Sequence, residues 1–116
     1  MSVSDRRESP LFAKAHDFNV WLLQHTAKFP RQYRHTLTER LERSALEFER
    51  CLGRCLILKQ PTALADADLE LWEVRRVIRL AHDLNILPAR LLEYAFQALT
   101  ELGRLLGAWR AKGTET

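Results

Sequence analysis

Proline is rare in this chain, and its positions limit the possible fold more than any other feature of the sequence. The chain contains four prolines, Pro10, Pro30, Pro61 and Pro88, separated by long segments without another. Proline is compatible with the first turn of a helix, where its missing N–H would have no partner, but it disrupts a helix interior. The spacing therefore predicts four helices, at about residues 10–27, 31–59, 62–85 and 88–111.

Apolar residues recur at helical spacing within each of these segments. A helix with such an apolar stripe must bury it against other helices. Because short connections make consecutive helices antiparallel neighbours, we predict an all-α, up-down-up-down four-helix bundle at residues 10–111, with flexible segments at 1–9 and 112–116. In the third segment, for example, the stripe consists of Leu64, Ala67, Leu71, Val74, Ile78 and Ala81.

Residues that favour helix ends lie near the predicted boundaries. The sequence Thr36-Leu37-Thr38-Glu39 fits a capping box, so the second helix is expected to begin properly at Thr36, after a separate turn at 30–34. The other expected caps are Ser9 and Thr62 at helix N-termini and Asn85 and Gly113 at helix C-termini.

The overall composition is that of an ordinary soluble domain with a small positive charge. Eighteen Lys and Arg against 15 Asp and Glu leave a net charge of +3, which permits an anionic partner without requiring one. The sequence has neither an apolar window long enough to span a membrane nor an amino-terminal signal peptide, so we expect a cytoplasmic protein with no membrane partner. Cys51 and Cys55 lie one helical turn apart and are expected to be buried free thiols.

The third and fourth helices carry more apolar surface than one bundle core requires. Such exposed apolar stripes are typical of an interface, and a helical glycine is easier to explain if another backbone approaches it. The alternative is a wide core-facing arc with two tolerated glycines. The residues expected at an interface between copies of the chain are Leu69, Val77, Leu80 and Leu84 on the third helix and Phe96, Gly103 and Gly107 on the fourth.

Arginines gather on the polar sides of the second and third helices, and Trp72 lies beside those of the third. Arginine neutralises phosphate while an aromatic ring can stack on a base, so such a face suits RNA or single strands. The same face would also suit an acidic protein or be an ordinary solvated surface. The candidate residues are Arg31, Arg34, Arg40, Arg43, Arg50, Arg54, Arg75, Arg76 and Arg79.

Sequence signatures of catalysis and metal binding are missing. The chain has no Glu-x-x-His pair, no phosphate-binding loop, no nucleophile elbow and no Cys-x-x-Cys motif. The neighbours His82 and Asp83 are more simply explained as a polar pair at a helix end than as a catalytic dyad. We therefore expect no enzyme activity, no cofactor and no metal.

Three stretches of the sequence resemble the accessory variability determinant (Avd) family of diversity-generating retroelements. They are "KFPRQYRHTLTERLE" at 28–42, "RLAHDLNIL" at 79–87 and "LTELGRLLGAW" at 99–109, and the similarity extends over about residues 12–110. The family is part of a broader four-helix bundle superfamily that includes proteins encoded in 23S rRNA intervening sequences. The chain departs from the family at "LGAW", where "LGGW" is frequent.

The resemblance implies a non-catalytic, homopentameric barrel with a basic surface. Such proteins bind the reverse transcriptase and nucleic acid of the element, and they support the mutagenic cDNA synthesis that precedes retrohoming. By resemblance, Arg31, Arg34, Arg40, Arg79 and Arg104 belong to the three shared motifs. The alternative is a structural, oligomeric bundle of the intervening-sequence type without a nucleic-acid role.

Overall fold

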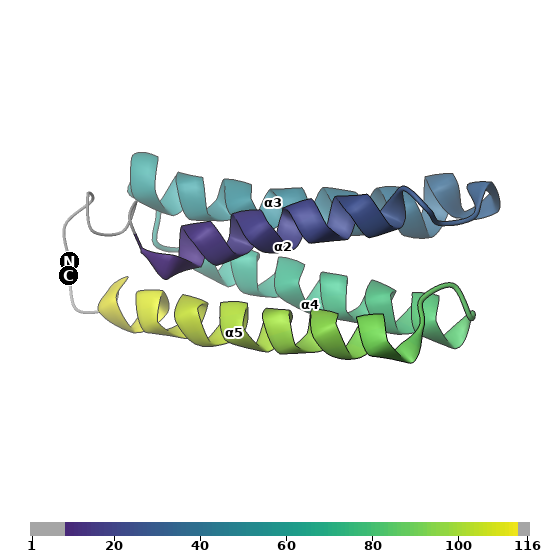
Figure 1. The fold of residues 1–116 in the computed structure, drawn as a ribbon. Coiled ribbons are helices and arrows are strands. Elements are labelled where there is room, and N and C mark those ends of the chain that lie inside the picture. Colours follow the sequence, from purple (N-terminus) through teal and green to yellow (C-terminus); the bar gives the residue numbers. More distant parts are fainter. Residues whose placement is uncertain (1–8, 114–116) are drawn as a thin grey trace.

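A computed structural model describes residues 9–113 and shows an all-helical chain, without a strand among those residues (Figure 1). The all-α prediction is confirmed, and the predicted terminal segments 1–9 and 112–116 lie, apart from residues 9, 112 and 113, outside the described part. The elements are α2 (Pro10–Thr26), the 3₁₀ turn η1 (Arg31–Tyr33), the π-helical turn η2 (Arg34–Thr38), α3 (Glu39–Ile57), α4 (Ala63–Asp83) and α5 (Ala89–Gly113).

Ion pairs between α3 and α4 show how these two helices run relative to each other. Arg54 near the end of α3 pairs with Asp66 near the start of α4, while Arg40 near the start of α3 pairs with Glu73 further along α4. These two helices therefore run in opposite directions, and they form the most extensive helix–helix contact of the fold. Figure 1 shows the four long helices lying roughly along one direction.

The core is built from the apolar stripes that the sequence predicts. All six residues of the stripe on α4 are at most 4% exposed. The other helices contribute large side chains that solvent does not reach, each stabilising the fold by roughly 1.5–3 kcal/mol when fully buried. The largest of them are Leu11 of α2, Leu41 and Leu52 of α3, and Leu99, Leu102 and Leu106 of α5.

Two buried polar residues fix α2 on α3. Asn19 is 5% exposed and donates from Nδ2 to the carbonyl of Ala45 (3.1 Å) and to Glu49 Oε1 (2.6 Å). Thr26 is 2% exposed and donates from Oγ1 to Glu42 Oε2 at 2.5 Å. Since buried polar groups must be hydrogen-bonded, these bonds specify the alignment of the two helices and hence the position of the turn between them.

The prediction for the start of the second long helix is wrong. Thr36 lies inside the π-helical turn, where its hydroxyl donates to the Tyr33 carbonyl (3.3 Å), and α3 begins only at Glu39. An N-cap residue needs an extended backbone, but Thr38, just before α3, has helical angles (φ −62°, ψ −53°) and makes no cap hydrogen bond. Ser9 and Thr62 do precede α2 and α4 as predicted, although neither side chain makes a cap hydrogen bond.

Asn85 ends α4 as the sequence predicts. Its φ of 63° lies in the left-handed region, and its N–H donates to the His82 carbonyl at 2.9 Å. The N–H of Ile86 donates to the Ala81 carbonyl at 2.9 Å, which completes a Schellman motif. Gly113, the other predicted C-terminal stop, is the last residue of α5.

Both cysteines are buried and neither forms a disulfide, as predicted. Burial raises the pKa of the Cys51 thiol, which disfavours the reactive thiolate. These thiols therefore act as small core residues in this structure.

Candidate nucleic-acid interface

The nine arginines singled out in the sequence differ in whether a carboxylate already pairs with them. Exposed pairs of this kind contribute about 0–1 kcal/mol to stability, so they hold an arginine only weakly. The four paired arginines are Arg40 with Glu73, Arg43 with Glu39 (2.9 Å), Arg54 with Asp66 (3.3 Å) and Arg79 with Asp83 (3.3 Å).

The other five arginines make no ion pair with any residue between 9 and 113. Four of them are exposed, and Arg75 is half-buried. A partner can approach these guanidinium groups without first displacing a carboxylate. They are Arg31, Arg34, Arg50, Arg75 and Arg76.

Arg31 and Arg34 are held together by the turn that joins α2 to α3. Pro30 precedes the turn with φ −58°, and its carbonyl accepts a hydrogen bond from the Tyr33 N–H at 3.0 Å. Phe29 and Tyr33 pack partly against the core and anchor the turn, while Arg31 and Arg34 remain exposed. The alternation of aromatic and arginine in this stretch thus divides its side chains between the core and solvent.

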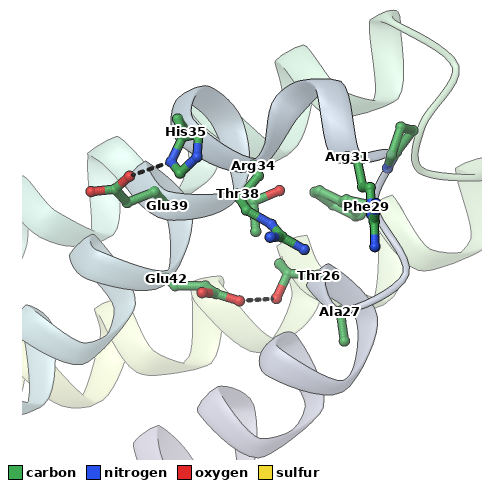
Figure 2. A pocket seen from close by; sticks show the side chains of 10 residues that line it. Thr26, Ala27, Phe29, Arg31, Arg34, His35, Thr38, Glu39 and Glu42 are labelled. Carbon is green, nitrogen blue, oxygen red and sulfur yellow. Dashed lines mark hydrogen bonds and ion pairs between the residues drawn. The ribbon is translucent and has the colours of Figure 1, made fainter.

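The turn borders a hollow of about 490 Å³ (Figure 2). Figure 2 shows Arg31 and Arg34 projecting from the turn on the side where Thr26 and Glu42 meet. The hollow is therefore formed by three successive elements: the end of α2, the turn and the start of α3. Phe29, His35, Thr38 and Glu39 also line it.

The hollow contains polar groups as well as the two guanidinium groups. Glu42 accepts the Thr26 hydroxyl through Oε2, and its Oε1 atom makes no hydrogen bond within the described residues. The buried hydroxyl of Thr38 likewise makes none. Glu39 is held by Arg43, and its Oε2 lies 3.6 Å from His35 Nδ1.

A second candidate surface is the outer strip of α4, formed by Leu69, Trp72, Arg76 and Leu80. Leu69 is 61% exposed, Trp72 55% and Leu80 47%. A shallow groove beside this strip is lined by Trp72, Arg76 and Leu80 together with Arg40 and Arg79. The structure therefore brings predicted interface leucines and predicted nucleic-acid arginines onto one face.

The remaining predicted interface residues are not on that strip. Val77 differs from the prediction because it is 6% exposed and belongs to the core, whereas Leu84 is 44% exposed near the end of α4. On α5, Phe96 lines a shallow apolar hollow with Ala89 and Leu92.

The two glycines of α5 have different surroundings. A Cβ added at Gly103 would lie 3.7 Å from an Arg75 guanidinium nitrogen, and one added at Gly107 would meet no atom of the described residues within 4 Å. Arg75 therefore lies over α5, away from the outer strip of α4. Neither glycine is required by packing against residues 9–113.

Sequence reasoning missed the carboxylates and hydroxyls that surround the arginines. Glu42, Thr38 and Glu73 were not predicted as site residues. Glu73 meets Arg40 only when α4 packs on α3, and Glu42 meets Thr26 only when α2 packs on α3. The presence of many acidic residues on the arginine-bearing helices was visible in the sequence, but their pairing was not.

Other chemistry considered from the sequence is not assembled in residues 9–113. His82 Nδ1 lies 2.9 Å from the Leu87 carbonyl, and Asp83 pairs with Arg79, so the two neighbours do not form a dyad. Within that range no three His, Cys, Asp or Glu residues gather to hold a metal ion. None of the helices described is both long and apolar enough to cross a membrane.

Comparison with known proteins agrees with the three motifs. No curated protein matches the chain. The model of a family described as bAvd-like matches residues 11–113, which include the α2–α3 turn, the outer strip of α4 and nearly all of the described bundle. The chain belongs to the bAvd-like family.

Proposed function

We propose that this chain is a non-catalytic accessory protein of a diversity-generating retroelement. It binds the reverse transcriptase and the template RNA in the cytoplasm and supports mutagenic cDNA synthesis and retrohoming. Membership of the bAvd-like family supports this assignment. The observation that carries it is the set of guanidinium groups without ion partners among residues 9–113, above all Arg31 and Arg34 at the α2–α3 turn.

The proposal includes self-association into a homopentameric barrel built from up-down-up-down bundles. The exposed strip of Leu69, Trp72 and Leu80 supports self-association, because exposed apolar patches on small domains mark interaction sites. A ring would also repeat the cationic turn once in every subunit and so strengthen the field that a polyanion meets.

A second candidate function is a structural, oligomeric module without a nucleic-acid role. Carboxylates already pair with four of the nine candidate arginines, and Trp, Leu and Arg on one strip are typical of protein interfaces. This alternative predicts that the arginines of the turn can be removed without loss of function.

Reconstituted cDNA synthesis tests the proposal. The reverse transcriptase and template RNA of the same element are combined with the wild-type chain or with the double variant Arg31→Ala/Arg34→Ala. We expect template-dependent cDNA with the wild type and at least a tenfold loss with the variant, since roughly 1–3 kcal/mol depends on each charged contact. A control removes two exposed cations from the end of α5, Arg110→Ala/Lys112→Ala, of which Arg110 pairs with Asp68 of α4 (3.2 Å). Equal cDNA yields with and without the wild-type chain would overturn the proposal.

A further inference from the structure

The hollow at the α2–α3 turn has the size and chemistry of a binding site for a small molecule or for one residue of a polymer. Its volume of about 490 Å³ falls within the usual range of small-molecule pockets. It combines cations, carboxylate hydrogen-bond acceptors and an aromatic ring. The ligand inferred for this site rests on the proposed function.

The cationic side of the hollow suits a phosphate. Arg31 and Arg34 are three residues apart, and neither is held by a carboxylate of the described chain. Their side chains project from the turn on the same side in Figure 2. Two guanidinium groups that line one hollow can share the oxygens of one phosphate, which arginine binds through paired N–H groups.

The hollow also presents a hydrogen-bond acceptor, the Glu42 carboxylate. Glu42 Oε1 and the Thr38 hydroxyl make no hydrogen bond within residues 9–113. A carboxylate only accepts hydrogen bonds, so a ligand that contacts Glu42 must present N–H or O–H groups to it. Inorganic phosphate alone would bring its own negative charge against Glu42.

A nucleotide presents both kinds of group, whereas an acidic peptide does not. A run of carboxylates would satisfy Arg31 and Arg34 but would bring further negative charge against Glu39 and Glu42. A nucleotide has one anionic group, an apolar face that can lie on Phe29 and a base edge with N–H donors. The base must be unpaired, because pairing occupies that edge.

We propose that this hollow binds one unpaired nucleotide of the RNA. Its phosphate lies between Arg31 and Arg34, its base lies along Phe29, and the base edge donates hydrogen bonds to the Glu42 carboxylate. The site therefore selects a single-stranded segment or a strand end rather than a duplex.

Fluorescence anisotropy with short labelled RNAs tests this inference on the full chain. The probes are one sequence with a 5′-phosphate, with a 5′-hydroxyl, with its 5′-terminal base removed, and as a blunt duplex. We expect the single strand to bind at least about tenfold more tightly than the duplex, and removal of the phosphate or the terminal base to weaken binding several-fold. Arg31→Ala and Arg34→Ala should each abolish most of these differences, while Arg110→Ala should preserve them.

The outcomes separate the inference from the proposed function. RNA binding that is indifferent to strand state, to the terminal nucleotide and to both turn arginines would overturn the inference and leave the proposed function standing. The absence of any RNA binding would overturn both. Displacement of RNA by a hexaglutamate peptide, together with loss of that displacement in the turn variants, would reassign the hollow to an acidic protein.

A crosslink on the wild-type chain keeps the test independent of whether the variants fold. RNA with a 5′-terminal 5-bromouridine is irradiated in the complex, and the modified peptide is identified by mass spectrometry. The inference expects the crosslink within residues 26–42. A crosslink confined to α4 or α5 would overturn it.

Discussion

Arg40 of α3 and Glu73 of α4 form a hydrogen-bonded ion pair across the two helices, next to exposed Trp72 and Arg76. The side chain of Arg40 is 67% exposed and that of Glu73 only 18%, so the carboxylate is the more constrained partner. Part of the positive charge of this face is thus neutralised within the chain itself.

Release of Arg40 should therefore strengthen RNA binding. In Glu73→Gln the glutamine has the same shape but no charge, and Arg40 becomes available beside Arg76. We expect RNA affinity at low salt to rise by about threefold, with a loss of stability below about 1 kcal/mol. Glu101→Gln, which releases Arg104 on α5, is the matched control and should change affinity less. Affinity that is unchanged in Glu73→Gln would mean that the α4 face does not meet RNA.

The apolar side chains of the α4 strip should control self-association. Leu69→Ser/Leu80→Ser removes two exposed leucines without creating a cavity, so helicity and melting temperature should change little. We expect sedimentation to shift from an assembly toward the single 13.5 kDa chain. Val20→Ser, at a 44% exposed position of α2, serves as the control. An assembly that survives the double variant unchanged would place the interface elsewhere.

Asn85 offers a test of the backbone geometry that ends α4. Its φ of 63° suits glycine and asparagine but costs other residues about 1 kcal/mol or more. Asn85→Gly should therefore match or exceed the wild type in urea denaturation, while Asn85→Ala should lose about 1 kcal/mol. Equal stability of the two variants would contradict the left-handed conformation.

Glu70 should make stability depend on pH. Burial raises the pKa of this carboxyl above its ordinary value of 4.5, and a hydrogen bond from Ser44 offsets the effect only in part. The folded chain therefore holds the proton more tightly than the unfolded chain does. Its stabilising contribution is present when Glu70 is protonated and is lost as the pH rises through the folded-state pKa.

The corresponding variant is Glu70→Gln, which stays neutral at every pH. We expect it to melt at a higher temperature than the wild type at pH 7, with the difference shrinking as the pH falls toward 4.5. Glu93→Gln changes an exposed glutamate of α5 and is the control. A wild-type advantage at pH 7 would contradict the expected sign.

The sequence predicts the parts of this fold that depend on local pattern. Helical periodicity identifies the buried stripe of α4, and Asn85 marks where that helix ends. The turn was harder to predict, because a capping box at Thr36 competes with the anchoring of Phe29 and Tyr33 in the core. The anchoring of Phe29 and Tyr33 in the core prevails over the capping box. The chain therefore continues through a π-helical turn, and α3 has no capped start.

Only part of the candidate site could be predicted from the sequence, because the rest depends on how the helices pack. The arginines at 31 and 34 stand out in the sequence, but Glu42 and Thr38 become part of a site only when α2 and α3 align. Val77 shows the opposite case, since its place on the helical wheel suggested a surface that the packing of α3 against α4 covers. Helical spacing specifies a direction around one helix, while exposure depends on the neighbouring helices.

The central claim is that the cations of the α2–α3 turn bind the phosphates of RNA, and the salt dependence of RNA binding tests it most directly. The logarithm of the binding constant is plotted against the logarithm of salt concentration for the wild type and for Arg31→Ala/Arg34→Ala. Each lost phosphate contact should reduce the slope by about 0.7–0.9, so the account predicts weaker binding and a slope shallower by roughly 1.5. An unchanged slope and affinity in a folded double variant would contradict it.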